Sequence, residues 1–335
     1  MTATGEPAQL DRRVFDAAVL MAQHPPRLHD TNKRIVFEVT CPPGAIDRGS
    51  IGFTRWAALS PPEHLDPMPT DLVASAPGFF DYRPVIDGDD VVEWHLNFAD
   101  PDLFAYYGGG LFAQDEMQVA EHPALGALRE ALVAAGIDAR TKTVDGPTPI
   151  LVTGVERRVV VATNHDASSG RPHGLYGNAF AAATPDAVRR ATTLVDPPTI
   201  TNLVAVAAIA GGRGRYTRDE IRRTLVTAFT GFRAAAVESA RLAGGPARIV
   251  VHTGYWGCGA FGGNRVLMAL LQVLAAWMAG LERLPFHTGS PGGEAPLADA
   301  LDLIAALTRG TPVATEDVLA AIDGQGFRWG VSDGN

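Results

Sequence analysis

Residues 247–264 read ARIVVHTGYWGCGAFGGN, and residues 265–279 continue as RVLMALLQVLAAWMA. The β-branched run at 248–252 predicts a strand, and the apolar run that begins at Asn264 predicts a buried helix. The glycine-rich loop between them, residues 252–264, brings backbone N–H groups to the start of the helix, where phosphate or diphosphate groups bind well. We therefore expect an α/β unit with a candidate anion site in this loop.

Further strands and helices alternate along the chain on both sides of this unit. Strands are predicted at 91–100 (VVEWHLNFAD), 149–154 (PILVTG), 158–163 (RVVVAT), 203–209 (LVAVAAI) and 284–287. Helices are predicted from 114 to 136, from 217 to about 242, at 297–308 and at 315–323. Strands that alternate with helices predict an α/β sheet covered by helices on both faces.

The first 90 residues have a weaker pattern. Residues 8–24 carry apolar side chains at helical spacing until Pro25 and Pro26 stop the pattern, and residues 34–40 (RIVFEVT) predict a strand. The proline-rich stretches nearby indicate an irregular, wrapping segment over residues 25–85. We therefore divide the chain into an N-terminal extension that wraps the core, residues 1–90, and the core itself, residues 91–335.

The composition excludes several classes of protein. The chain has 335 residues, 46% of them hydrophobic, and a formal net charge of −9, so it is neither disordered nor a protein that binds mainly nucleic-acid backbones. Its two cysteines, Cys41 and Cys258, supply no disulfide framework, and its nine histidines lack the i, i+4 pairing of a metal site. The apolar run at 266–279 is too short to span a bilayer, and residues 1–13 lack the apolar centre of a secretory signal. We expect a cytoplasmic protein with no membrane partner, no metal and no cofactor.

A second loop that could carry chemistry is YYGGGLFAQDE, residues 106–116. Its three consecutive glycines allow the backbone to approach a ligand closely. The adjacent carboxylates Asp115 and Glu116 lie where a helix is predicted to begin, and their mutual repulsion can keep one of them protonated near neutral pH as a general acid. An acidic first turn that complements the helix dipole explains the same pair more simply when the loop is considered alone.

The loop at 252–264 admits two other interpretations. Gly257, Gly259 and Gly262 satisfy the G-x-G-x-x-G dinucleotide fingerprint, but Gly257 lies six residues after Val251, whereas the turn of that fingerprint is tight. Cys258 could be a nucleophile, but no histidine follows it at a recognised family spacing, which favours a small buried thiol. A nicotinamide-dinucleotide oxidoreductase is therefore the least favoured of the functions considered.

Together, the two loops resemble the poly(ADP-ribose) glycohydrolase family, whose catalytic domain is an elaborated macrodomain. The family motif of three glycines followed by Gln-Glu-Glu is matched by Gly108, Gly109, Gly110, Gln114, Asp115 and Glu116. The family loop Thr-Gly-Asn-Trp-Gly-Cys-Gly-Ala-Phe-Gly-Gly is matched by TGYWGCGAFGG at 253–263, with one substitution in eleven positions. The likeness covers about residues 91–325. It implies a macrodomain-like mixed sheet flanked by helices on both faces, preceded by a helical or irregular extension.

Several departures from the family pattern surround the expected position of the distal ribose. The middle Glu of the motif is Asp115 here, and the Asp and Asn of the family's strand motif appear exchanged, as Asn97 and Asp100. Tyr255 replaces an Asn that in the family lies beside the ribose. We expect these changes to reshape the side of the pocket where a leaving group sits.

The resemblance implies a role for each matched residue. Glu116 would be the acid and base that acts at the anomeric carbon of the distal ribose, and Asp115 would bind the ribose or tune its neighbour. The loop at 253–263 would hold the diphosphate, and the triple glycine would pack on the other side. Phe286 or His287 could flank the adenine. The implied substrate-binding residues are Asn97, Asp100, Gly108, Gly109, Gly110, Gln114, Tyr176, Thr253, Gly254, Tyr255, Gly257, Cys258, Gly259, Ala260, Phe261 and Gly262.

The leading hypothesis for function is a hydrolase that cleaves the O-glycosidic bond of ADP-ribose units on a polymer, a protein or a nucleic acid. The retained Glu116 favours this hypothesis over a catalytically silent ADP-ribose-binding macrodomain. A net charge of −9 offers no general attraction for a long polyanion. We therefore expect exo cleavage or release of single units, without sequence-specific binding of nucleic acid.

Overall fold

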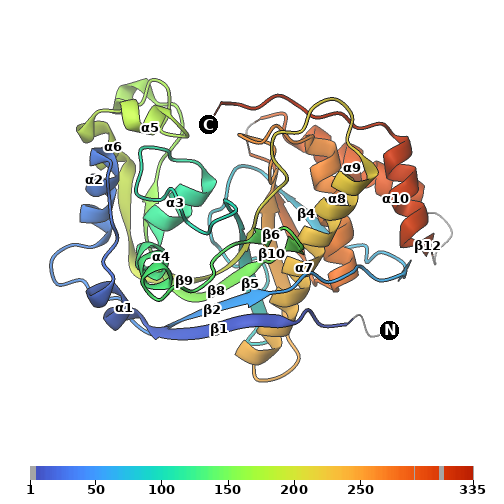
Figure 1. The fold of residues 1–335 in the computed structure, drawn as a ribbon. Coiled ribbons are helices and arrows are strands. Elements are labelled where there is room, and N and C mark those ends of the chain that lie inside the picture. The colour runs from blue at the N-terminus through green and yellow to red at the C-terminus, as the bar shows by residue number, and fades with distance from the viewer. Residues whose placement is uncertain (1–4, 290, 309–312, 335) are drawn as a thin grey trace.

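The computed structural model describes residues 5–289, 291–308 and 313–334. Its central sheet has eight strands in the order β1-β2-β8-β9-β5-β10-β11-β4 (Figure 1). Neighbouring strands are antiparallel from β1 to β9 and parallel from β9 to β4. Their bounds, in the order of the sheet, are Gln9–Asp16, Ser50–Trp56, Ile150–Val161, Thr192–Val206, Val91–Phe98, Arg248–Gly254, Leu284–His287 and Val73–Ala76. Two short pairs, β3 (His64–Leu65) with β12 (Val313–Ala314) and β6 (Lys142–Thr143) with β7 (Gly146–Pro147), lie outside this sheet.

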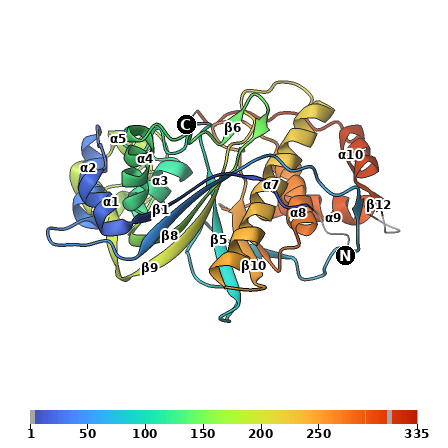
Figure 2. The ribbon, with the colours of Figure 1, turned by 60° about the horizontal axis from the view of Figure 1, so that its bottom comes forward.

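Two groups of helices cover the two faces of the sheet (Figure 2). Successive side chains of a strand point to opposite faces, and in β9 Leu203 and Ala205 join one hydrophobic cluster while Val204 and Val206 join the other. The first group is α1 (Ala17–Gln23), α2 (Thr31–Thr40), α3 (Gln114–Glu121), α4 (Ala124–Ala134), α5 (Ala179–Ala182) and α6 (Pro185–Ala191). The second is α7 (Arg218–Leu242), α8 (Arg265–Ala279), α9 (Glu294–Leu307) and α10 (Thr315–Gly324). The predicted fold class, a mixed α/β sheet flanked by helices, is confirmed.

The predicted elements after residue 90 are present, with two changes in how they are divided. The strands predicted at 149–154 and 158–163 are one continuous strand, β8. The helix predicted from 114 to 136 is two helices, because Pro123 has no backbone N–H to continue α3. Across the described ranges, no helix combines the length and the apolar character that a membrane span needs.

Two predictions for the N-terminal region are wrong. Residues 9–16 of the predicted helix form β1, which pairs with β2 and leaves Leu10 and Val14 exposed; helix α1 begins only after Asp16, whose carboxylate caps it. The strand predicted at 34–40 is part of α2. Asp30 caps this helix by accepting a hydrogen bond from the Lys33 N–H at 3.0 Å, and one face of the helix is buried in the core. Tertiary packing here overrides the strand preference of β-branched residues.

Residues 25–85 are also more regular than predicted, because they contain α2, β2, β3 and β4. The sheet continues across residue 90, since β1 and β2 form one edge and β4 forms the other. The division of the chain into an extension and a core stays a prediction about domain organisation.

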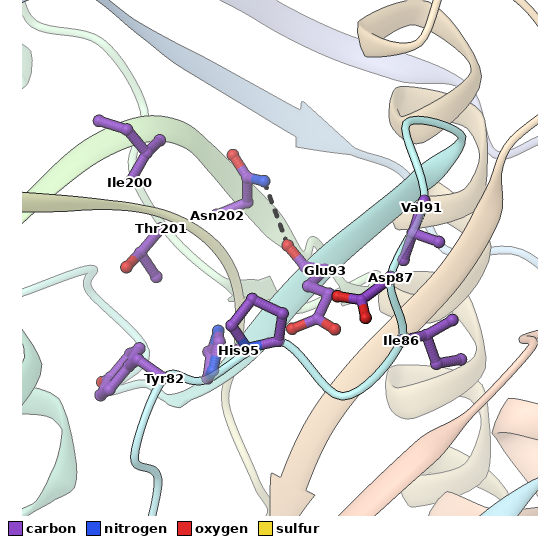
Figure 3. Close-up of a pocket in the computed structure, with 11 residues that line it drawn as sticks. Tyr82, Ile86, Asp87, Val91, Glu93, His95, Ile200, Thr201 and Asn202 are labelled. Atoms are coloured by element: carbon purple, nitrogen blue, oxygen red, sulfur yellow. Dashed lines mark hydrogen bonds between the residues drawn. The ribbon is translucent and has the colours of Figure 1, made fainter.

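A cavity of about 350 Å³ lies at the starting end of β5 (Figure 3). Glu93 and His95 of β5 line it together with Tyr82 and Asn202. The His95 ring is stacked between the rings of Tyr82 and His252, with centroids 4.3 Å away on each side. Both imidazole nitrogens of His95 are sealed from solvent and have no hydrogen-bond partner among the described residues. A molecule in this cavity therefore cannot reach those nitrogens without a rearrangement of the ring stack.

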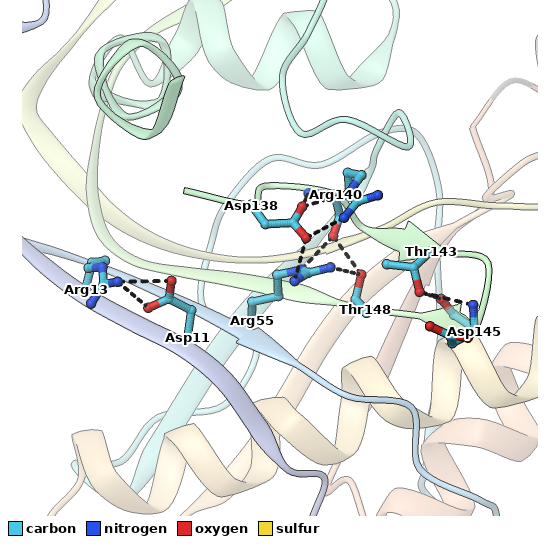
Figure 4. Close-up of polar contacts among 9 residues, drawn as sticks. Asp11, Arg13, Arg55, Asp138, Arg140, Thr143, Asp145 and Thr148 are labelled. Atoms are coloured by element: carbon cyan, nitrogen blue, oxygen red, sulfur yellow. Dashed lines mark hydrogen bonds and ion pairs between the residues drawn. The ribbon is translucent and has the colours of Figure 1, made fainter. Parts of the chain in front are cut away.

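A polar cluster fastens the β6–β7 hairpin to β2 (Figure 4). The buried guanidinium of Arg55 donates to the Arg140 carbonyl oxygen at 2.9 Å and to the Thr148 hydroxyl oxygen at 3.1 Å. It also pairs with the Asp138 carboxylate at 3.0 Å. Arg55 thereby holds the chain between α4 and β8 against the sheet.

We predict that Arg55→Met lowers the free energy of unfolding by about 1–3 kcal/mol, because buried hydrogen bonds to a charged donor are lost. The control is Arg13→Met, since Arg13 pairs with Asp11 at 3.2 Å on a half-exposed part of β1. Its expected effect is at most about 0.5 kcal/mol. Urea unfolding of the two variants measures both values, and equal losses would contradict the role given to Arg55.

Candidate active site

A cavity of about 190 Å³ lies where β5 and β10 end. These strands are parallel, with Val91–His95 paired to Arg248–His252, so the loops that follow them leave the sheet at the same edge. The residues that line the cavity are Phe98, Ala99, Asp100, Tyr106, Leu111, Ala113, Gln114, Asp115, Glu116, Tyr176, Ala208, Trp256, Gly257, Gly259, Ala260 and Phe261. The parallel pairing thus brings together the two loops that the sequence singled out.

The carboxylate pair belongs to the first turn of α3. Asp115 is 6% exposed and Glu116 is 4% exposed, and both line the cavity. Glu116 Oε2 accepts a hydrogen bond from the backbone N–H of Ala113 at 3.1 Å, which is the arrangement of a helix-capping residue. The capping explanation and the catalytic explanation of Glu116 are therefore compatible, since one oxygen caps the helix while the carboxyl group faces the cavity.

Side-chain amides attach this turn to β5. Gln114 accepts a hydrogen bond from the Phe98 N–H at 2.7 Å and donates one to the Leu96 carbonyl oxygen at 3.0 Å. Asn97 donates from Nδ2 to Asp115 Oδ1 and to Gln118 Oε1, both at 2.9 Å. Gln114 and Asn97 therefore set the position of the carboxylates, and Asn97 does so from behind the cavity wall.

Burial changes the acidity of both carboxyl groups. It raises the pKa of Asp115 to about 8, helped by the neighbouring charge of Glu116 and opposed by the hydrogen bond from Asn97. Burial also raises the pKa of Glu116, against the opposing charge of Lys33 and the backbone N–H groups of the helix start. The two groups titrate as a pair. At neutral pH the pair therefore retains a proton that it can donate to a ligand in the cavity.

The triple glycine lies in a closely packed part of the fold. A Cβ added to Gly108 would lie 2.3 Å from the Arg27 carbonyl oxygen, and one on Gly110 would lie 2.9 Å from Ala181 Cβ and 3.2 Å from Asp30 Oδ2. The glycines thus allow close packing against the segment before α2 and against α5. Gly108, Gly109 and Gly110 do not line the cavity.

The loop after β10 supplies the opposite wall. Trp256 is buried and donates from Nε1 to the Val206 carbonyl oxygen at 3.0 Å. Gly257 has φ +73°, and a Cβ on it would lie 2.6 Å from Ala208 Cβ, so this turn needs glycine. Burial raises the pKa of the Cys258 thiol to about 12, which keeps it protonated and weakly nucleophilic.

Several predicted ligand residues lie outside the cavity lining. Thr253 is buried and donates its hydroxyl proton to Gln272, and Gly254 accepts a hydrogen bond from Gln272 Nε2 at 3.0 Å. Cys258 lies behind the loop and packs on the hydrophobic core. Gly262 contacts the backbone of residues 330–332. The loop reaches the cavity through Gly257, Gly259, Ala260 and Phe261.

Three aromatic residues that the sequence assigned to the ligand site, Tyr255, Phe286 and His287, lie outside the cavity lining. Tyr255 donates its hydroxyl proton to the Gly293 carbonyl oxygen and packs edge-on against Phe286 at 5.1 Å between ring centroids. It is not a lining residue, so it cannot reshape the cavity directly. Phe286 is fully buried in the core, and His287 is hydrogen-bonded to His252 at 3.1 Å, so neither lines the cavity. Tyr176 does line it, as predicted.

The sequence reasoning missed several lining residues. Tyr106 and Leu111 lie on either side of the triple glycine, and Phe98 and Ala99 lie within the LNFAD stretch. The signal in the sequence for these four residues is that they lie next to the predicted site residues. Among the described residues, no group of three or more His, Cys, Asp or Glu side chains is arranged to hold a metal ion.

The chain after α10 runs across the top of the view in Figure 1, and its residues 330–334 lie against the loop after β10. Gly330 N–H donates to the Gly262 carbonyl oxygen at 2.8 Å, and Asp333 N–H approaches the Gly259 carbonyl oxygen at 3.4 Å. On the other wall Asn178 Nδ2 donates to the Gly334 carbonyl oxygen at 3.0 Å. The segment therefore connects the loop after β10 with the loop that carries Tyr176.

In the wild-type protein we expect the free energy of unfolding to fall between pH 5 and pH 8, and we predict that Asp115→Asn reduces this fall. A folded-state pKa near 8, against about 3.9 in the unfolded chain, means that the native state binds more protons in this window, so the free energy of unfolding falls as pH rises. The variant lacks this titration. Asp138→Asn is the control, because the Arg140 hydrogen bond lowers the pKa of Asp138 to about 2, outside the window. Equal pH slopes for wild type and Asp115→Asn in urea titrations would refute the assignment.

Comparison with known proteins agrees with this site. Residues 151–291 match the family described as poly(ADP-ribose) glycohydrolase, Macro domain fold. This segment contains the loop after β10 but not the first turn of α3.

Solved structures of similar proteins include the poly(ADP-ribose) glycohydrolase from Thermomonospora curvata, 17% identical, with 86% of this chain and 85% of that chain covered and a TM-score of 0.41. The enzyme from Deinococcus radiodurans in complex with ADP-ribose is 10% identical, with 86% of this chain and 92% of that chain covered and a TM-score of 0.39. The segment 151–291, which includes the loop at the cavity, is therefore similar to the poly(ADP-ribose) glycohydrolase family.

Proposed function

We propose that this protein is a glycosidase that hydrolyses the O-glycosidic bond of ADP-ribose units. The observation that supports the proposal most strongly is the cavity itself, where two buried carboxyl groups face the glycine loop of the matched family segment. A catalytically silent ADP-ribose-binding module would need the loop but not a carboxyl pair that retains a proton at neutral pH.

In the proposed mechanism Glu116 is the acid and then the base. Its protonated carboxyl group donates to the oxygen that leaves the anomeric carbon of the distal ribose, and the bond between that carbon and oxygen breaks. The resulting carboxylate accepts a proton from the water that attacks the same carbon. Asp115, which accepts a hydrogen bond from Asn97, would be a second polar group beside the ribose. Glycosidases commonly divide these roles between two carboxyl groups, whereas in this mechanism Glu116 has both.

The loop after β10 would hold the diphosphate opposite the carboxyl pair. Gly257, Gly259 and Ala260 present backbone without large side chains to the cavity, and Phe261 forms its wall. A diphosphate bound there would add negative charge near Glu116 and Asp115. This charge would further favour their protonated forms, which suits the donation step.

We predict that Glu116→Gln lowers the hydrolysis rate at least about 100-fold, because the amide cannot donate and recover a proton. The amide oxygen can still accept the hydrogen bond from the Ala113 N–H, so the helix start and ADP-ribose binding should survive. Release of ADP-ribose from modified peptides measures the rate, and calorimetry with ADP-ribose measures binding.

Asp115→Asn is the matched variant, with an expected loss smaller than that of Glu116→Gln. Equal losses would show that Glu116 is not the sole acid. A wild-type protein that binds ADP-ribose but releases none from any acceptor would be a binding module instead.

For the acceptor, we propose terminal ADP-ribose units or single units on a protein or nucleic acid. Two observations support this preference: the net charge of −9, and the segment 330–334, which lies against the loop after β10 at Gly259 and Gly262. Tyr255 does not support this preference, because its hydroxyl group donates to the Gly293 carbonyl oxygen and its side chain does not line the cavity. A long polyanion threading through the site would meet Asp333 beside Gly259.

We expect initial release of ADP-ribose to be at least as fast from singly modified peptides as from long polymer, at matched concentration of chain ends. Chromatography of the early products separates ADP-ribose from oligomers. Early appearance of long oligomers would indicate internal cleavage and overturn the preference.

We also propose a cytoplasmic location. It is supported by the two cysteines, both free thiols, of which Cys41 has a pKa raised to about 11 by burial. Fractionation of cells that produce the protein tests this location.

A further inference from the structure

The side chain of Lys33 is fully buried under the loop that precedes the carboxylate pair. Lys33 belongs to the first turn of α2, in the region for which the sequence predicted little structure. Its ammonium group donates to the carbonyl oxygens of Tyr107 and Leu111, each at 3.0 Å. These two residues flank the triple glycine on either side. One buried cation therefore connects both ends of the glycine stretch.

Aromatic rings complete the surroundings of this ammonium group. The centroids of the Phe112 and Phe180 rings lie 4.9 and 5.7 Å from Nζ. The neighbouring Asn32 donates to the Phe180 and Ala183 carbonyl oxygens at 2.8 and 2.9 Å, which fixes α5 against α2. Carbonyl oxygens and ring faces stabilise a cation, but they provide no full negative charge.

The carboxyl groups that face Lys33 come from two elements. Asp30 caps its own helix, and Asp115 and Glu116 lie in the first turn of α3. Burial lowers the pKa of the Lys33 ammonium group to about 8, and the charges of Glu116, Asp115 and Asp30 oppose this shift. Asp100, in the loop after β5, also acts on the carboxyl pair. Its negative charge raises the pKa values of Asp115 and Glu116, whereas the positive charge of Lys33 lowers them. Lys33 is thus the basic side chain whose charge lowers the pKa values of both carboxyl groups of the cavity.

Lysine is rare in this chain, which makes its presence here informative. Of the 28 basic residues only Lys33 and Lys142 are lysines, and the others are arginines. A compact ammonium group can donate to two carbonyl oxygens in a closed site, whereas the planar guanidinium of arginine needs more room. A compact ammonium group therefore suits the closed site under the glycine loop.

We propose that Lys33 is a positioning residue of the active site, which holds residues 107–111 in place and supplies the positive charge that faces Asp115 and Glu116. This inference rests on the proposed function of the cavity. It explains why the glycines pack against the segment around α2 instead of lining the cavity, since that packing brings the two carbonyl oxygens to the ammonium group. It also gives the N-terminal region a direct part in the chemistry.

The removal of this charge has a predictable direction. A carboxyl group near a cation loses its proton more easily, so without Lys33 the pKa values of the pair rise. Lys33→Met keeps the length of the side chain and removes the charge and the donors. We expect both limbs of the pH profile of kcat to move upward by about one pH unit. A purely structural role would lower kcat at every pH without moving the profile.

The experiment compares wild type, Lys33→Met, Lys33→Gln and Lys142→Met. Lys142 is the matched control, because it is the other lysine and lies outside the cavity lining on β6. Its removal should leave the profile in place. An unchanged profile in both folded Lys33 variants would overturn the proposal.

Carboxyl carbon titrations by NMR test the same inference without a substrate. The Asp115 and Glu116 signals should titrate at higher pH in Lys33→Met than in wild type, even if the protein hydrolyses nothing, which separates this inference from the proposed function. If neither Lys33 variant folds, the nitrogen signal of Lys33 in wild type decides the question. An ammonium group that is charged at pH 6 supports the proposal, and a neutral amine at that pH overturns it.

Discussion

The parallel pairing of β5 with β10 is the constraint on which the site depends. Hydrogen bonds between Val91–His95 and Arg248–His252 align the two strands, so both chains leave the sheet at one edge. Residues 99–113 and 255–264 are far apart in the sequence, but in the fold they face each other. The carboxyl pair of α3 and the glycine loop before α8 meet across the cavity for this reason.

A second constraint is that few groups compensate the carboxyl groups that are buried near this edge of the sheet. Asp115 and Glu116 have lost most of their water, and Asn97, the Ala113 N–H and the ammonium of Lys33 are the groups that compensate. The resulting pair holds a proton at neutral pH, which an exposed acidic helix start would not do. A capping position and the proposed catalytic acid thus occupy the same helical turn.

The sequence predicted the second half of the fold well because its signals are local. Thr217 with Glu220 and Asn264 cap α7 and α8 through their own neighbours, and the apolar run at 284–287 is too short for a helix. Residues 8–40 failed because local preference and tertiary packing disagree there. Leu10 and Val14 have helical spacing but lie exposed on an edge strand. The β-branched residues of α2 favour a strand, but they form a helix that Asp30 caps and that buries one face in the core.

The sequence alone determined the kind of chemistry, because Gln114-Asp115-Glu116 and the eleven residues at 253–263 are contiguous motifs whose residue types carry their own meaning. Only the tertiary structure decided how each member acts. Gln114 and Asn97 bind the helix start to β5, the triple glycine packs on the segment around α2, and Tyr255 turns away to Gly293. Lys33 stands more than seventy residues before the loop that it holds. No local pattern marks such a residue, because its role comes from burial and from two carbonyl oxygens that meet only in the folded chain.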